Sequence, residues 1–290
     1  MKIKKFISLI LVFIGFNFVS AQDDLLNQLD TISTNKKEVE VSAFKGLQIC
    51  NMQSTKMPVK GEWYVLISHR FGDLAKGVDN FFGLDEAMTK IGAIYGATNW
   101  LSFGVSRHRN NKIYELALKY KMANQEVDGF PVTIVGYNTM DIRSDKLSVI
   151  YPYSKFNNRL AYSTQLLVSR KFSDNFSLEL APILVHKNLY DGIEDKKNTL
   201  LLGSGARYKI TKRMSVNLEY AARLNLPEGF TSQYHNPLSL GLDIDTGGHI
   251  FQMVFSNSQP MNDVTAFTNS SGRWDGTKQF YFGFNMYRVF

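Results

Sequence analysis

The chain has 290 residues, of which 44% are hydrophobic, 13% aromatic and 20% charged, with a formal net charge of +7 at pH 7 and one Cys. Its 21 Phe and 14 Tyr give more apolar surface than a solvated coil carries, so the composition excludes intrinsic disorder. A single Cys excludes a disulfide framework and a metal site built from several thiolates.

The N-terminus has the parts of a secretory signal peptide. Lys2, Lys4 and Lys5 precede an apolar stretch from Phe6 to Phe18, and small residues up to Ala21 offer a cleavage site. The stretch is shorter than the roughly 20 residues of a transmembrane anchor. We therefore expect residues 1–21 to be a signal peptide that is cleaved after Ala21. The mature chain then keeps 30 Lys and Arg against 26 Asp and Glu, a mild and scattered excess that indicates no nucleic-acid partner.

Residues 22–60 are polar and show no sustained hydrophobic period, which predicts a poorly structured periplasmic leader. From residue 61 onward, apolar residues recur with a period of two. Met214, Val216 and Leu218, for example, share one face, and Ser215 and Asn217 share the other. We count about twelve such segments, near 62–71, 87–96, 99–107, 112–121, 130–142, 159–172, 175–186, 199–210, 214–224, 237–245, 249–257 and 279–290.

A soluble sandwich and a barrel in lipid would both bury one face of every strand, and the connections distinguish them. If the leader lies on the inner side, the outward connections are long, at about 72–86, 143–158, 187–198, 225–236 and 258–278, with one short exception at 107–111. The inward connections are mostly tight, at 97–98, 173–174, 211–213 and 246–248, with one longer stretch near 123–129. This asymmetry predicts that residues 61–290 form an antiparallel transmembrane β-barrel of about 12 strands in the outer membrane of a Gram-negative bacterium.

The last predicted strand alternates aromatic residues and runs to the end of the sequence. This pattern resembles the signal by which outer-membrane barrels are recognised for insertion, and its candidate residues are Phe280, Phe282, Phe284 and Phe290. We therefore expect two kinds of partner: the barrel-insertion machinery during assembly, and outer-membrane lipid around the finished barrel.

Four further segments resemble a known family. They are Ser68 to Gly72, Asn80 to Asp85, Ile91 to Gly96 and His249 to Ser258. These segments resemble an uncharacterised β-barrel family of the outer membrane of Bacteroidetes, a domain of unknown function, over about residues 60–290. The resemblance implies a fold and a location, and the family offers no activity, cofactor or catalytic residue to carry over.

Ionisable side chains gather on the face that the barrel would turn inward. The candidates for lining the lumen are Glu115, Lys119, Arg159, Glu179, Arg207, Glu219, Arg223 and Asp243. Glu179, Arg207, Glu219 and Asp243 lie on successive strands, so aligned registers would give a row of alternating sign. Two interpretations stay open: opposite charges pair and fill the lumen, or they form a polar constriction that selects small solutes.

No pattern of residues indicates catalysis, a cofactor or a metal. The five His residues lie at no spacing that would place two rings on one ion from a single element. Ser106 and His108 share a strand face, but a hydrolase also needs a group that orients the His and an oxyanion site, and neither can be identified. We therefore expect a protein that is not an enzyme.

Three smaller features bear on the lumen. Aromatic residues of the loops, such as Phe81 and Phe82, could make a binding surface or fold into the barrel mouth, and the segment Asn80 to Asp85 is the first candidate for such a plug. Gly203 and Gly205 lie inside a strand, where small residues relieve crowding or let the sheet bend. Cys50 has no Cys or His nearby, which favours a buried or incidental thiol.

The sequence favours the passage or binding of a small polar solute through or within the lumen. The alternative is a non-conducting barrel with a structural or surface-interaction role in the cell envelope. An unobstructed path through the lumen would distinguish the two.

Overall fold

The computed structural model describes residues 39, 42–193, 195–226, 232–273 and 279–290. The predicted signal peptide, residues 1–21, lies outside the described residues. Within the described part of the chain, no helix is long and apolar enough to span a membrane.

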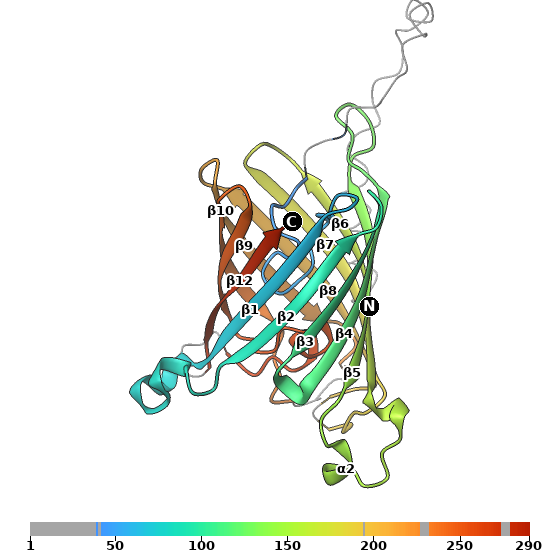
Figure 1. Ribbon diagram of the computed structural model, residues 1–290, viewed down its shortest axis with the longest axis vertical. Helices are drawn as coiled ribbons and strands as arrows, with labels where there is room; N and C mark the ends of the chain where they lie inside the picture. Colours follow the sequence, from blue (N-terminus) through green and yellow to red (C-terminus); the bar gives the residue numbers. More distant parts are fainter. Residues whose placement is uncertain (1–38, 40–41, 194, 227–231, 274–278) are drawn as a thin grey trace, which may run out of the picture. The chain divides into compact units, whose positions relative to one another are not determined.

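Twelve antiparallel strands in the described residues close into a barrel (Figure 1). They are β1 (Trp63–Asp73), β2 (Met88–Gly96), β3 (Leu101–His108), β4 (Ile113–Ala123), β5 (Thr133–Arg143), β6 (Leu160–Lys171), β7 (Phe176–Lys187), β8 (Asn198–Lys209), β9 (Met214–Arg223), β10 (Leu238–Asp245), β11 (His249–Ser256) and β12 (Tyr281–Val289). Each strand pairs with its neighbours in the sequence, and β12 pairs with β1 to close the sheet. The predicted fold is confirmed.

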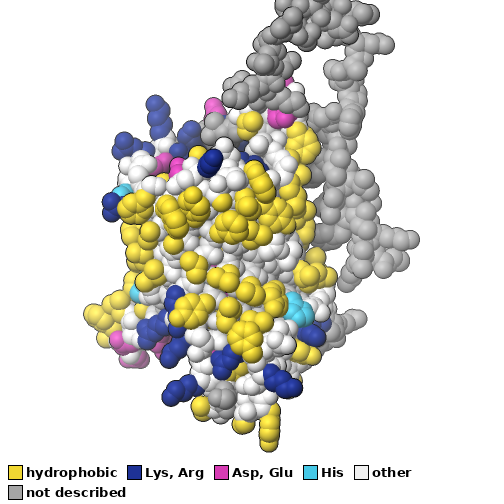
Figure 2. Space-filling model, turned by 45° about the vertical axis from the view of Figure 1, so that its right-hand side comes forward, with side chains coloured by type: hydrophobic (Ala, Val, Ile, Leu, Met, Phe, Trp, Pro, Cys, Tyr) yellow, Lys and Arg dark blue, Asp and Glu magenta, His cyan; other side chains and the backbone are white. Residues whose placement is uncertain are grey.

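The barrel is apolar outside and polar inside. On β9, Leu218 is 49% exposed on the outer face, while Ser215, Asn217 and Glu219 are buried on the inner face. Figure 2 shows hydrophobic side chains covering the waist of the barrel, with Lys and Arg gathered toward both ends. Such a surface suits a surrounding layer of hydrocarbon between two aqueous phases.

The two ends of the barrel differ as the sequence predicts. At one end, here called the turn end, tight turns join the strands, and the first and last strands meet through hydrogen bonds between Trp63 and Phe290. The opposite end, here called the loop end, carries the long connections and their short helices. These are η2 (Leu74–Gly83), η3 (Asn110–Lys112), α2 (Leu147–Ile150), η4 (Phe156–Arg159) and α3 (Asp263–Thr268).

Two segments fill the barrel from opposite directions. Residues 42–58, here called the inner plug, precede β1 and run inside the barrel as the blue chain of Figure 1. Residues 257–271, here called the outer plug, directly follow β11 in the connection to β12. They include α3, whose Val264 and Phe267 are buried. Residues 42–58 belong to the segment 22–60, which we expect from its sequence to be poorly structured. The structure instead packs residues 42–58 inside the lumen.

The candidate plug at Asn80 to Asp85 takes another position. It belongs to η2 and the residues after it, which project sideways from the end of β1 (Figure 1). Phe81 and Phe82 are 60% and 57% exposed. The expectation that this segment closes the barrel mouth is wrong, because the two plugs occupy the lumen and hydrogen bonds to the end of β1 hold η2 outside it.

Candidate functional site

The carboxylate of Glu219 holds the tip of the inner plug. It accepts the backbone N–H groups of Cys50 at 3.0 Å, Asn51 at 2.9 Å and Met52 at 2.9 Å. Successive N–H groups that converge on one anion form a strong site, because each hydrogen bond is charge-assisted. On the neighbouring part of the wall, Glu179 accepts the N–H of Thr55 at 3.0 Å. The backbone of the inner plug therefore donates hydrogen bonds to both Glu219 and Glu179.

Amide and cationic side chains of the wall bind the carbonyl groups of the same segment. The pairs are Asn217 and Gln252 with Ile49, Asn285 with Cys50, Lys119 with Leu47, and Arg207 with Ala43, at 2.6 to 3.3 Å. The wall thus binds the main chain of the plug at many points. Plug side chains add further contacts: Asn51 accepts from Arg70 at 2.9 Å, and Gln48 accepts from the hydroxyl of Tyr287.

Glycines on the inner face make room for plug side chains. A Cβ atom at Gly203 would lie 2.5 Å from Cε of Met52, and one at Gly241 would lie 2.7 Å from Sγ of Cys50. A Cβ atom at Gly205 would overlap the side chain of Ile49. The crowding that the sequence indicates at Gly203 and Gly205 is therefore crowding against the inner plug. Cys50 is fully buried there, and burial raises the pKa of its thiol well above the usual value.

Six of the eight predicted lining residues are buried inside the barrel: Glu115, Lys119, Glu179, Arg207, Glu219 and Asp243. The strand registers do not align the last four into a row of alternating sign. Gly205 lies opposite both Glu179 and Glu219, whereas Arg207 lies opposite Asn217 and Asp243 lies opposite Ser215. The two acids therefore flank a glycine, which leaves both of them free to receive the plug.

Arg159 and Arg223 lie at the loop end. Arg159 ends η4 and donates to the carbonyl groups of Arg143 and Asp145 at 3.0 and 2.8 Å. Arg223 ends β9 and donates to the carbonyl of Tyr234. Both guanidinium groups thus hold loop backbone in place, and neither arginine is among the six buried lining residues.

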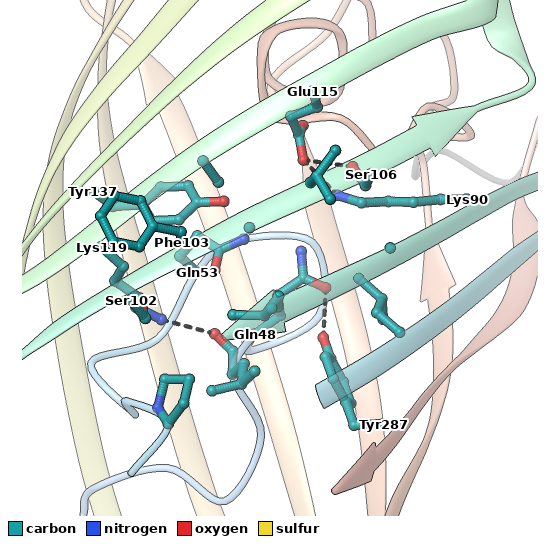
Figure 3. Close-up of a pocket in the computed structure, with 18 residues that line it drawn as sticks. Gln48, Gln53, Lys90, Ser102, Phe103, Ser106, Glu115, Lys119, Tyr137 and Tyr287 are labelled. Carbon is teal, nitrogen blue, oxygen red and sulfur yellow. Dashed lines mark hydrogen bonds and ion pairs between the residues drawn. The ribbon is translucent and has the colours of Figure 1, made fainter. Parts of the chain in front are cut away.

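Glu115 is the centre of a buried polar network. Its carboxylate accepts from Lys90 at 2.9 Å and from Ser106 at 3.1 Å (Figure 3). Ser106 Oγ also lies 3.0 Å from Nε2 of His108. The carboxylate is also 3.6 Å from that same Nε2. A serine hydrolase needs its carboxylate on the other ring nitrogen, Nδ1. The cavity beside this network has a volume of about 40 Å³, room for little more than water.

The outer plug docks on the same network through its side chains. Asn262 donates to Asp141, Gln165 donates to Asp263, and the N–H of Asp263 points to Glu115 at 3.4 Å. Lys90 reaches the carbonyl of Met261, also at 3.4 Å. Burial and the neighbouring Glu115 raise the pKa of Asp263 to about 7, so the docked loop favours a proton on this carboxyl.

The two plugs share one buried apolar cluster. Met52 and Met57 of the inner plug belong to it together with Val264 and Phe267 of the outer plug. The wall contributes Val135, Tyr137, Leu167, Ala181, Ile183, Val185, Leu201 and Ala221. The lumen therefore contains chain that enters from both ends of the barrel.

A larger cavity of about 400 Å³ opens among the loops of the loop end, and is here called the vestibule. Its lining combines cations, acids, amides and a phenol: Asn110, Arg143, Arg159, Lys187, Asp195 and Tyr234 are among its residues. Ion pairs join Arg143 to Asp145 and Lys187 to Asp195, each at 2.8 Å. Among the described residues, no three His, Cys, Asp or Glu side chains are grouped so that they could hold a metal ion.

The predicted insertion residues lie in β12 or directly beside it. Phe282 and Phe284 face outward on β12 and pack against Phe255 and Phe251 of β11, with ring centroids 4.9 and 5.7 Å apart. Phe280 precedes β12, and Phe290 is 63% exposed at the turn end. Their recognition by insertion machinery stays a prediction.

A closed sheet with an apolar exterior, a polar inner wall and long connections at one end defines a β-barrel of the bacterial outer membrane. The chain belongs to the family described as "Membrane bound beta barrel domain (DUF5777)", whose model matches residues 44–290. This match confirms the resemblance to a membrane-barrel domain of unknown function, and it includes most of the inner plug. No curated protein matches the sequence.

Several solved outer-membrane proteins are similar to the barrel. The KdgM porin has a TM-score of 0.48 and 10% identity over 78% of this chain and 99% of that chain. Omp33 of Acinetobacter baumannii has a TM-score of 0.42 and 10% identity over 81% and 100%. An outer membrane channel from Pseudomonas putida F1 has a TM-score of 0.43 and 12% identity over 81% and 97%.

Proposed function

We propose that the protein is an outer-membrane channel for a small polar solute, closed in the state described here and opened when its plugs leave the lumen. The observation that carries this proposal is the set of inward glycines, Gly203, Gly205 and Gly241, whose space is filled by the inner plug. A small barrel built only as a scaffold can fill its interior with side chains of its own wall. This wall instead leaves that space to a separate segment of chain.

The polar wall supports the same proposal. Glu219, Asn217 and Gln252 bind the plug by hydrogen bonds that water can replace, because each of these groups is well solvated when exposed. Withdrawal of the inner plug would leave a hydrated, charged lumen, as in barrels that conduct. Its glutamates, lysine and arginine would then face the passing solute.

The vestibule is the proposed site where the solute first binds. Its mixture of paired charges, amides and a phenol suits a small polar molecule better than a hydrocarbon. The outer plug forms part of its floor through Val264 and Thr265, so a solute held there contacts the segment that must move. An origin in Bacteroidetes, which the sequence resemblance implies, also stays a prediction. We assign the protein no enzymatic activity.

The second candidate function is a non-conducting barrel of the cell envelope. The apolar cluster that joins Met52 to Phe267 favours it, because burial of these side chains stabilises the filled lumen. Under this alternative the plugs never leave, and the exposed loops interact with other envelope components.

Conductance in planar bilayers distinguishes the two functions. We expect Gly205→Val to expel the inner plug, because the new side chain takes the place of Ile49, and so to produce frequent conductance steps where the parent protein opens only rarely. Ser204→Val is the matched control: it adds the same side chain one residue away on the outer face, and should leave the barrel closed. A folded Gly205→Val barrel that releases its plug, as shown by labelling of Cys50, and still does not conduct would support the non-conducting function.

A further inference from the structure

The connection between β1 and β2 exposes a group of large apolar side chains. Val78 is 76% exposed, Phe81 60%, Phe82 57% and Leu84 47%. An exposed apolar patch of this kind on a short segment marks a surface that contacts something other than water. Residues 74–87 are here called the β1–β2 loop.

The loop is held in a fixed conformation. Asp73 accepts the N–H of Ala75 at 2.9 Å, and Asn80 bridges the loop by donating to the carbonyl of Asp73 and accepting the N–H of Gly83, both at 2.9 Å. Lys76 and Glu86 form an ion pair at 2.6 Å. These contacts fix the base of the loop and leave its apolar side chains uncovered.

The backbone at the two aromatic residues is also constrained. Phe81 and Phe82 have φ values of 48° and 54°, in the left-handed region that bulky residues rarely adopt. Such a conformation persists only when the surrounding structure enforces it, and it is concentrated at functional positions. The exposure of both rings is therefore a property of the folded loop.

The loop continues the lipid-facing surface of the barrel. It starts where β1 ends, and Figure 1 shows η2 projecting sideways from that point. Near the end of β1, Phe71 stacks on Phe282 of β12 at 5.8 Å, and Phe282 packs on Phe255 of β11 at 4.9 Å. A loop that leaves a membrane barrel sideways, next to outward aromatic rings, lies over the bilayer and away from the lumen.

We propose that the β1–β2 loop is a membrane anchor, in which Val78, Phe81, Phe82 and Leu84 enter the interfacial layer of the lipid beside the barrel rim. Aromatic and aliphatic side chains favour this layer, and a fixed loop loses little conformational freedom on entering it. Gln259 of the outer plug donates to the carbonyls of Phe71 and Glu86, so the anchor also holds one end of the outer plug against the rim.

Depth-dependent quenching of tryptophan fluorescence tests the anchor. The three natural tryptophans, Trp63, Trp100 and Trp274, are first replaced by Phe, and Phe82→Trp is then introduced. The full-length protein is reconstituted in phosphatidylcholine vesicles with or without bromine on the upper acyl chain. We expect brominated lipid to quench the emission, since the ring contacts acyl chains. The emission maximum in vesicles should also lie at a shorter wavelength than that of tryptophan in water.

Tyr153→Trp in the same background is the control, because Tyr153 lies in the connection between β5 and β6 and is 97% exposed. Its emission should be insensitive to bromine. Equal, unquenched emission from positions 82 and 153 would overturn the proposal. A disulfide between two copies of Phe82→Cys in a Cys50→Ser background, formed in vesicles without quenching at position 82, would assign the surface to a second copy and would also overturn it.

Discussion

The inner and the outer plug close the same lumen by different chemistry. The inner plug offers backbone N–H groups and carbonyls to wall side chains, and Glu219 alone binds three of its amides. The outer plug offers side chains, and it brings the carboxyl of Asp263 close to Glu115 and Asp141. The inner closure therefore depends on the shape and hydrogen-bonding groups of the wall, whereas the outer closure depends on the buried apolar contact of Phe267 and also changes with the protonation of Asp263.

The largest expected effect is on the inner plug. Glu219→Ala leaves three backbone N–H groups without their charged acceptor, which we expect to weaken docking by about 4 kcal/mol. When local opening precedes the reaction, the rate at which a maleimide modifies Cys50 should rise about a thousandfold. In Glu219→Gln the labelling rate of Cys50 should rise less, because the amide oxygen of the new side chain still accepts hydrogen bonds. Unchanged labelling of a folded Glu219→Ala barrel would show that Glu219 does not hold the plug.

A smaller effect is expected when the apolar contact of the outer plug is removed. Phe267→Ala should cost about 3 kcal/mol, since it leaves a cavity in the shared cluster. The amide hydrogens of residues 262–269 should then exchange about a hundredfold faster in mass-spectrometric hydrogen exchange. Leu180→Ala removes a side chain from the outer, lipid-facing surface and should leave this exchange unchanged. Equal protection in the two variants would mean that Phe267 does not secure the loop.

The smallest expected effect is that of pH on the docking of the outer plug, and it distinguishes this plug from the inner plug. The docked pKa of Asp263, about 7, lies above that of a solvated carboxyl, so docking is favoured at low pH and this contribution is lost as pH rises through 7. The titratable groups that interact with this carboxyl are Glu115, Asp141, Lys90, Lys119 and Tyr137. Between pH 6 and pH 8 the outer plug should lose on the order of 1 kcal/mol, which is about a tenfold change in its docking equilibrium.

This pH effect is best measured where the inner plug is already displaced, in the Gly205→Val barrel. Its open probability should rise from pH 6 to pH 8, and Asp263→Asn, which cannot lose a proton, should remove the rise. The same pH dependence in the presence of Asp263→Asn would place the titrating group elsewhere and contradict the description of the outer plug.

Much of the fold follows from local alternation. The segment predicted at 175–186 is β7 at Phe176–Lys187, because a period of two fixes both the strand and the face that each side chain takes. The same parity places Glu179 and Glu219 inside. These predictions need only neighbouring residues, and the closed barrel satisfies them all at once.

The plugs could not be predicted in the same way. Residues 42–58 have no hydrophobic period, and their partners lie far away in sequence, as in the contact between Cys50 and Glu219. The six residues of α3 are too few to give a helical pattern. One signal was available: Gly203, Gly205 and Gly241 stand at inward positions, where missing side chains leave space for another segment. The aromatic residues of Asn80 to Asp85 make this segment a candidate plug, because an apolar loop can enter a barrel. Such a loop can also contact lipid, and the sequence alone does not distinguish the two positions.

We expect solute and ions to pass only when the inner plug leaves the wall, and modification of Cys50 reports this departure directly. Single-channel recordings of the parent protein in the presence of a membrane-impermeant maleimide should show rare openings that become permanent, because alkylated Cys50 can no longer fit against Gly241. Cys50→Ser should keep the rare openings and lose their permanence. Steady conductance through barrels whose Cys50 remains unmodified would show that ions pass a seated plug, and would contradict the account.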